Sequence, residues 1–273
     1  MTKRPRRAAL PAAAFLSAVL IAAGFILSTN AARGALIDLA TRILPGLEGT
    51  PSAETSEHAA TGLTVRDFAA CGPLQTGDLV FRRGFGTESR LILEAQGKGR
   101  VPYSHVGIVA DTNPVTIVHA TTTDDPKHPN SVVASSLADF LALGDAAGVV
   151  RPAWNDDLKR RAARRALGMK GEAFWLVPDD PDALYCTTLI EKALSPDLKP
   201  DFPRTTVKVP VLGGDYLFPA ALWEADGMTP VCRVEKPGRA ADGGAPHKAS
   251  PHDCGSGNLH IGRSASFEAP ANL

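Results

Sequence analysis

The N-terminal segment restricts the fold of this chain more than any other part of the sequence. The basic residues Lys3, Arg4, Arg6 and Arg7 precede an uncharged, mostly apolar run from Ala8 to Asn30. About 20 residues of helix cross the hydrocarbon core of a bilayer, and positive flanks stay on the cytoplasmic side. The run therefore predicts a single membrane-spanning anchor, with the rest of the chain outside the cytoplasm.

A cleaved secretory signal is the alternative interpretation of this segment. The small residues of Asn30-Ala31-Ala32 lie near its end, where a signal peptidase would cut. The apolar run is longer than the core of a typical signal peptide, which favours an uncleaved anchor. We expect a single-pass protein of the inner membrane whose remaining residues lie on the periplasmic side.

Composition divides the chain into four parts. Residues 1–30 form the anchor or signal, and residues 31–63 form a linker that ends in a polar, small-residue stretch. Residues 64–234 contain the apolar patterns that a core needs. Residues 235–273 are rich in Gly, Ala, Pro and Ser without apolar periodicity, so we expect a disordered tail.

Charge and cysteine spacing exclude several classes of function. Lys plus Arg and Asp plus Glu both number 29, so there is no basic excess to bind nucleic acid. The cysteines fit no C-x-x-C spacing and the chain has no H-E-x-x-H motif, so we predict neither a metal nor a cofactor. In an oxidising compartment a Cys71–Cys232 disulfide is one possibility, but spacing leaves the pairing of Cys71, Cys232 and Cys254 open.

Local patterns predict the secondary structure of the central part. Gly77 launches a strand, and two apolar, β-branched segments separated by Asp-Thr-Asn-Pro indicate a β-hairpin. Apolar residues at helical spacing predict the helices, the last of which starts near Cys186 and stops before Pro196. The predicted strands are 78–81, 105–110 and 115–121, and the predicted helices are 87–96, 135–143, 156–169 and 186–195.

Three residues of this part have the chemistry of nucleophilic catalysis. A thiol attacks a carbonyl only as thiolate, so it needs a base within hydrogen-bond reach and a third group that orients that base. Cys186 at a helix N-terminus would have its thiolate favoured by the helix dipole. His105 and His119 lie on the two hairpin strands and would face each other if they are register partners, which makes Ala110 to Pro114 the loop. A register slip of one residue would send the two imidazoles to opposite faces.

Three motifs together resemble a known family. They are Gly77-Asp78-Leu79-Val80-Phe81, Tyr103-Ser104-His105-Val106-Gly107-Ile108-Val109 and Tyr185-Cys186-Thr187-Thr188-Leu189-Ile190. The segment from about residue 74 to 220 is similar to the YiiX-like permuted papain amidases of the NlpC-like superfamily, relatives of lecithin:retinol acyltransferase. As in that permuted group, the histidine strand precedes the cysteine. The resemblance implies an α+β, circularly permuted papain-like (NlpC-like) fold, with an antiparallel sheet or small barrel packed against helices.

The resemblance also implies roles for individual residues. Cys186 matches the nucleophile, His105 the base and His119 the polar residue that orients the base. Many YiiX-like proteins have a Glu in the third role, so His119 departs from that pattern. The Cys186 backbone N–H is expected to supply part of an oxyanion hole. Tyr103 and Tyr185 are candidates to add a hydroxyl, and Asp78 is a candidate to pair with a group of the site or to make a turn hydrogen bond.

These residues predict a cysteine amidase or peptidase that acts through a covalent thioester. Cell-wall peptides and lipoproteins are the substrates expected in that compartment. A lipid-directed thioesterase or acyltransferase is the alternative, suggested by the anchor and by the acyltransferase kinship. An alternative of another class is a non-catalytic module that keeps the fold and binds a ligand in the cleft. The expected partners are thus a peptide, lipoprotein or lipid substrate and, through the N-terminal helix, the membrane.

Overall fold

A computed structural model of the chain describes residues 62–208 and 213–236. The predicted anchor, nearly all of the predicted linker and nearly all of the predicted tail lie outside these residues. Within the described ranges no helix is both long enough and apolar enough to cross a membrane. The folded part reaches slightly past the predicted 64–234 domain, because Leu63 is buried and Glu235 still pairs in a strand.

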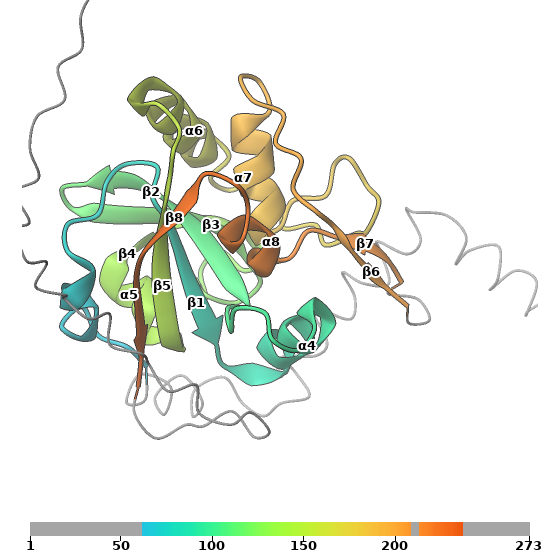
Figure 1. Ribbon diagram of the computed structural model, residues 1–273, viewed down its shortest axis with the longest axis horizontal. Coiled ribbons are helices and arrows are strands. Elements are labelled where there is room, and N and C mark those ends of the chain that lie inside the picture. The colour runs from blue at the N-terminus through green and yellow to red at the C-terminus, as the bar shows by residue number, and fades with distance from the viewer. Residues whose placement is uncertain (1–61, 209–212, 237–273) are drawn as a thin grey trace, which may run out of the picture. The chain divides into compact units, whose positions relative to one another are not determined.

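A six-stranded antiparallel sheet is the centre of the folded part (Figure 1). Its strand order is β4-β3-β2-β1-β5-β8. A separate two-stranded sheet pairs β6 with β7. The strands are β1 Leu79–Gly84, β2 His105–Thr112, β3 Val115–Thr121, β4 Ser131–Ser136, β5 Gly144–Pro152, β6 Thr205–Val207, β7 Gly214–Tyr216 and β8 Met228–Glu235.

Helices pack against the sheet, which confirms the predicted α+β class with an antiparallel sheet. Asn155 caps α6, because its side chain accepts a hydrogen bond from the Leu158 N–H. The helices are η1 Asp67–Cys71, α4 Gly86–Gln96, α5 Leu137–Ala142, α6 Asp156–Gly168, α7 Cys186–Leu194 and α8 Pro219–Trp223.

The two faces of the sheet contribute to two separate hydrophobic cores. In β1 the side chains of Leu79 and Phe81 belong to the core that includes α6 and α7, whereas Val80 belongs to the core beside η1 and α5. Successive side chains of a strand point to opposite faces, so a central strand covered on both sides is apolar throughout its buried part. The sheet is therefore the scaffold that separates α7 from α5.

Helix α7 begins at Cys186, as the sequence predicts. Tyr185 before it is extended, and the Thr188 hydroxyl oxygen accepts a hydrogen bond from the Tyr185 N–H at 2.8 Å. This contact pairs a backbone donor at the helix start. Leu189 and Ile190 are fully buried against the sheet core, which fixes the rotation of the helix and with it the direction of Cys186.

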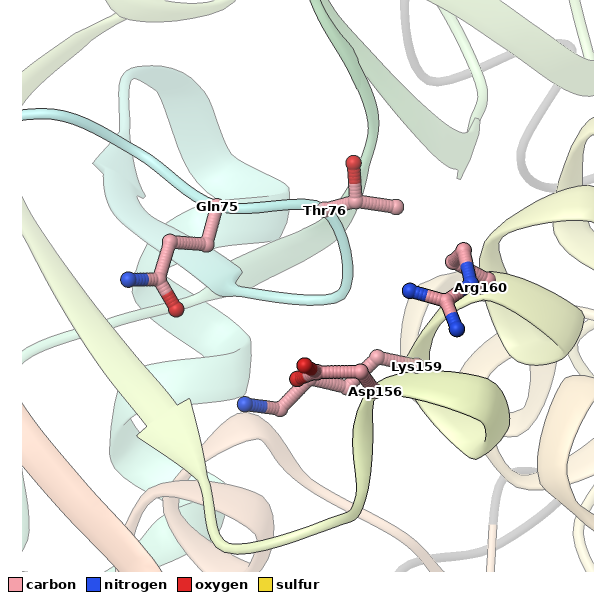
Figure 2. A pocket seen from close by; sticks show the side chains of 5 residues that line it. All are labelled: Gln75, Thr76, Asp156, Lys159 and Arg160. Atoms are coloured by element: carbon pink, nitrogen blue, oxygen red, sulfur yellow. The ribbon is translucent and has the colours of Figure 1, made fainter.

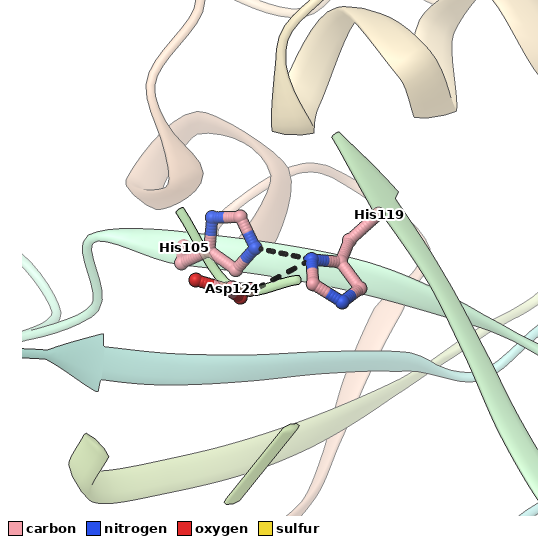
Figure 3. Close-up of side chains that lie close together, drawn as sticks. All are labelled: His105, His119 and Asp124. Carbon is pink, nitrogen blue, oxygen red and sulfur yellow. Dashed lines mark hydrogen bonds and ion pairs between the residues drawn. The ribbon is translucent and has the colours of Figure 1, made fainter. Parts of the chain in front are cut away.

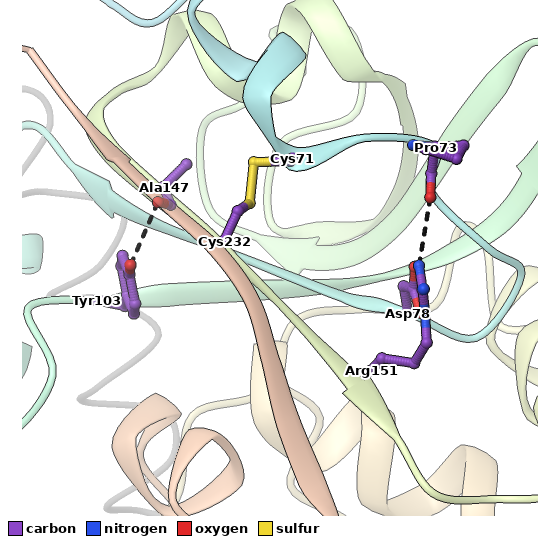
Figure 4. Close-up of a disulfide and its surroundings, with 7 residues drawn as sticks. All are labelled: Cys71, Pro73, Asp78, Tyr103, Ala147, Arg151 and Cys232. Carbon is purple, nitrogen blue, oxygen red and sulfur yellow. Dashed lines mark hydrogen bonds and ion pairs between the residues drawn. A yellow bond between two sulfur atoms is a disulfide. The ribbon is translucent and has the colours of Figure 1, made fainter. Parts of the chain in front are cut away.

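A disulfide joins Cys71 at the end of η1 to Cys232 on the edge strand β8 (Figure 4). It forms the pairing that the sequence left as one possibility. Among the described residues Cys186 is the free cysteine. The disulfide therefore leaves the candidate nucleophile available.

The predicted hairpin forms, but its loop is shorter than predicted. The strands pair as far as Thr112 and Val115, so the turn is Asn113-Pro114 with a cis peptide bond, and Ala110 lies at a bulge between paired residues. The prediction of a loop over residues 110–114 is wrong, because the bulge absorbs one residue and the strands continue past it.

Candidate functional site

The two histidines of the hairpin lie in hydrogen-bond contact (Figure 3). His105 Nε2 is 2.9 Å from His119 Nδ1, and the two rings meet edge to face. His119 is fully buried, and its Nε2 is 2.9 Å from the Ser135 hydroxyl on β4. Each ring nitrogen of His119 therefore has a partner, which fixes the orientation of the ring.

The register that brings the histidines together differs from the predicted one. Ile108 pairs with Val118, and continuing that register places His119 opposite Gly107 rather than opposite His105. The predicted pairing is wrong by two residues, and an even slip keeps both imidazoles on the same face. A Cβ atom at Gly107 would lie 3.2 Å from His119 Cβ, so the glycine leaves room for His119 to reach His105 diagonally.

Cys186 lies at the N-terminus of α7, in the core on the α6 and α7 side of the sheet. Its sulfur accepts hydrogen bonds from the backbone N–H groups of Val106 and Thr187. Because the β2–β3 ladder ends at the Ile108–Val118 pair, the Val106 N–H that points toward β3 is available to the sulfur. The structure thus places the Cys186 sulfur at the backbone of the residue that follows His105.

Burial keeps the three groups uncharged at rest. Burial raises the pKa of the Cys186 thiol to about 12, although the two backbone N–H groups lower it. Burial also holds the pKa of His105 well below its usual value and lowers the pKa of His119 to about 4. The expected lowering of the thiol pKa by the helix N-terminus is therefore outweighed by burial, so at rest the thiol is protonated and both imidazoles are neutral.

Acid is expected to destabilise the fold through His119. Its pKa is about 4 when folded and near 6.5 when unfolded, so the unfolded chain binds the proton first as the pH falls. Stability from this group is complete above pH 6.5 and is lost toward pH 4, by about 3 kcal/mol. Urea unfolding between pH 7 and 4.5 measures it. His119→Gln should reduce the dependence and leave the part due to His105, whereas the exposed His128→Gln should retain the full dependence. Equal slopes in all three proteins would contradict this assignment.

Residues that the sequence did not single out surround the histidines. Arg82 on β1 forms an ion pair with Asp124, whose Oδ2 is 3.5 Å from His119 Nδ1. The Phe140 ring of α5 packs against both imidazoles. Asp124 lies in the polar stretch that follows β3, where an acidic residue is typical of a loop and carries no signal of a site.

The other candidate residues have structural contacts. Asp78 forms a two-point ion pair with Arg151 and accepts a hydrogen bond from the Gln75 N–H, at the end of β1 away from Arg82 (Figure 4). The Tyr103 hydroxyl donates to the Ala147 carbonyl at 3.2 Å. The Tyr185 hydroxyl accepts from the Leu217 N–H at 3.0 Å. The structure does not bring these three side chains into the histidine network.

The two histidines and Asp124 are residue types that bind metal ions. Ligand atoms of His105, His119 and Asp124 lie within 4.8 Å of one another. Arg82 already neutralises Asp124, and the facing nitrogens share a hydrogen bond, so this arrangement fits a proton-transfer network better than a cation. A polar pocket lies elsewhere, between the turn before β1 and the start of α6, and is lined by Gln75, Thr76, Asp156, Lys159 and Arg160 (Figure 2).

Comparisons with known proteins find distant structural similarity. No family model matches the chain, and no curated protein matches it. Among solved structures, the metalloprotein yiiX from Escherichia coli O157:H7, described as DUF1105, is similar at 19% identity with a TM-score of 0.48. The match covers 60% of this chain and 99% of that one. A likeness of this size carries no argument about activity.

Proposed function

We propose that this chain is a cysteine hydrolase that acts by thiol acyl transfer on an amide or peptide bond outside the cytoplasm. The observation that supports it most is the position of the Cys186 sulfur at the backbone N–H of Val106, the residue that follows His105. The sulfur lies at the Val106 backbone, and the adjacent His105 has its Nε2 held by a second, buried imidazole. A nucleophile, a base and a group that orients the base are the three parts that such chemistry needs.

In the proposed mechanism the two ring nitrogens of His105 have different roles. His105 Nε2 is engaged with His119, so His105 Nδ1 is the nitrogen left to take the thiol proton. The thiolate sulfur then attacks the carbonyl carbon, and the proton on His105 passes to the departing amine as the C–N bond breaks. Water attacks the thioester in the second half, gives its proton to His105, and releases the acid and the thiol.

The oxyanion of the tetrahedral intermediate would lie at the start of α7. The Cys186 backbone N–H is the first of the helix and points out of its N-terminal end, where the helix dipole favours negative charge. Tyr185 and Tyr103 place their hydroxyl groups on backbone partners instead. The backbone therefore supplies this stabilisation without a tyrosine hydroxyl.

The extracytoplasmic location is part of the same proposal. Disulfides persist in oxidising compartments and are rare in the cytosol, so the Cys71–Cys232 bond supports it. The basic, apolar N-terminal segment would then place the protein in the inner membrane with the described residues in the periplasm. Cell-wall peptides and lipoproteins are the substrates that such a position offers.

A substrate panel tests the proposed reaction. The full-length protein in detergent micelles is incubated with an acylated peptide amide, a cell-wall tripeptide anilide and a long-chain acyl thioester. We expect release of amine from an amide substrate that is lost in Cys186→Ala and unaffected by EDTA. Turnover of the thioester alone would favour the lipid-directed alternative, and turnover that requires a metal would contradict a thiol mechanism. Ligand binding without turnover would favour a non-catalytic module.

A further inference from the structure

A buried ion pair lies beside the two histidines and is not needed by a three-residue catalytic site. The side chains of Arg82 and Asp124 are 6% and 10% exposed. Burying two charged side chains costs free energy of desolvation that a surface ion pair does not, so stability alone is a weak reason for an ion pair at this position. Arg82 is the register partner of His105 on the neighbouring strand, which places the pair next to the base.

Contacts with Phe140 and Asp124 hold the Arg82 side chain in one position. One guanidinium nitrogen, Nη1, donates to the Phe140 carbonyl at 3.0 Å, and the other, Nη2, donates to Asp124. The guanidinium also stacks over the Phe140 ring, 4.6 Å from its centroid. Since the same ring packs on both imidazoles, Arg82 fixes Asp124 relative to the histidines.

Asp124 lies close to His119 Nδ1, the nitrogen that His105 contacts. Its Oδ2 is 3.5 Å from His119 Nδ1, and that nitrogen is 2.9 Å from His105 Nε2. When His105 is ready to accept the thiol proton at Nδ1, its Nε2 carries hydrogen and donates to His119 Nδ1. His119 then carries its own hydrogen on Nε2, toward Ser135.

We propose that the Arg82–Asp124 pair positions a proton on His119, so that the relay from Cys186 has four members and ends at a carboxylate. This inference rests on the proposed function. The Cys186 S–H bond breaks as its proton moves to His105 Nδ1, and the hydrogen of His105 Nε2 moves to His119 Nδ1. Sulfur gains a negative charge and His119 a positive one, and Asp124 lies next to that positive charge.

The charges around the rings support opposite roles for the two partners. Burial is the main cause that lowers the pKa of His119, the charge of Asp124 raises it, and the charge of Arg82 lowers it. Arg82 and Asp124 affect the pKa of His105 in the same two directions. Glu88 of α4, which accepts a hydrogen bond from Thr122, is a further carboxylate near the site and raises the pKa of Cys186. Asp124 thus favours a proton on His119, and Arg82 opposes that protonation in the resting state.

The two partners can be separated by neutral substitutions in the full-length protein. Selective 15N labelling of histidine follows the His119 ring by NMR between pH 2.5 and 8. We expect Asp124→Asn to lower the His119 midpoint and Arg82→Gln to raise it, while the double variant returns it toward the wild-type value. Single-turnover acylation by a p-nitrophenyl ester should slow about 10- to 100-fold in Asp124→Asn, because the charged His119 loses its neighbouring carboxylate.

A purely structural ion pair would behave differently. Both single variants would then lose thermal stability alike and would leave the His119 midpoint unmoved, or move it in one direction, which would overturn the inference. If Arg82→Gln does not fold, Arg82→Lys is the second variant, because it keeps the positive charge but loses the two hydrogen bonds of the guanidinium. Arg82→Lys should slow acylation without raising the His119 midpoint. A raised His119 midpoint or unchanged acylation would contradict the inference. Cys186→Ala separates the two proposals, because acylation that survives it contradicts the hydrolase, whereas the NMR midpoints test the ion pair alone.

Discussion

Replacing Cys186 by alanine is expected to lower the hydrolysis of any amide substrate by at least about 10³-fold, because the covalent route disappears entirely. The alanine removes only a sulfur from the start of α7, while Leu189 and Ile190 keep the helix packed. The melting temperature should therefore stay within a few degrees of the wild-type value. Steady-state kinetics with circular dichroism on the same preparations measures both.

The matched control for this variant is a substitution of the proposed base. His105→Gln keeps a polar side chain of similar size but cannot accept the thiol proton at a basic nitrogen, so its loss should be of the same order. The double variant should be no slower than either single one, because the residues act as one unit. An active Cys186→Ala protein would show that the nucleophile lies elsewhere.

Removal of the Cys71–Cys232 disulfide should have the largest effect on stability. The bond closes a loop with a sequence separation of 161 residues. In the chain-entropy account a loop of this length stabilises the folded state by about 5 kcal/mol. Since a domain of this size is stable by only about 5–15 kcal/mol, the double variant Cys71→Ala/Cys232→Ala should unfold at markedly lower urea and temperature.

Reductant is the control for the disulfide prediction. Dithiothreitol should lower the free energy of unfolding of the wild type toward that of the double variant and should leave the double variant unchanged. A double variant as stable as the wild type would mean that the bond contributes nothing. Activity at low temperature should survive the loss, because the disulfide joins η1 to β8 and does not touch the histidine network.

Local sequence patterns were sufficient for the elements that carry the candidate site. Leu189, Ile190, Ala193 and Leu194 recur at helical spacing and are all fully buried, so the start of α7 at Cys186 follows from them. The β-branched hairpin segments likewise predict β2 and β3. These elements can be predicted because the residues that determine them are neighbours in the sequence.

Strand β5 and the boundary between β4 and α5 could not be predicted, because they depend on packing against residues that are distant in the sequence. Strand β5 begins Gly-Asp-Ala-Ala-Gly, a composition with little tendency to form strands. A Cβ atom at Gly148 would lie 2.8 Å from the Trp223 ring, so that residue is small because an aromatic from α8 packs there. The predicted helix over 135–143 starts only at Leu137, because Ser135 and Ser136 pair with β3.

The parts of the site that the sequence missed come from long-range contacts. Arg82 and Asp124 are 42 residues apart in the chain, and an isolated arginine or aspartate at such positions is usually a solvated surface group. The histidine register also escaped prediction, because the bulge at Ala110 shifts the pairing by an amount that no local pattern reveals. Burial of the thiol, which raises its pKa, depends on the whole fold.

Trapping the acyl-enzyme would show directly whether Cys186 is the nucleophile. The full-length protein is mixed with a p-nitrophenyl ester, quenched in acid within milliseconds and digested for mass spectrometry. We expect one acyl group on the peptide that contains Cys186, removable by neutral hydroxylamine and absent in Cys186→Ala. Acylation at other residues that persists in Cys186→Ala, or release of the acid with no adduct on Cys186 at any time, would contradict it.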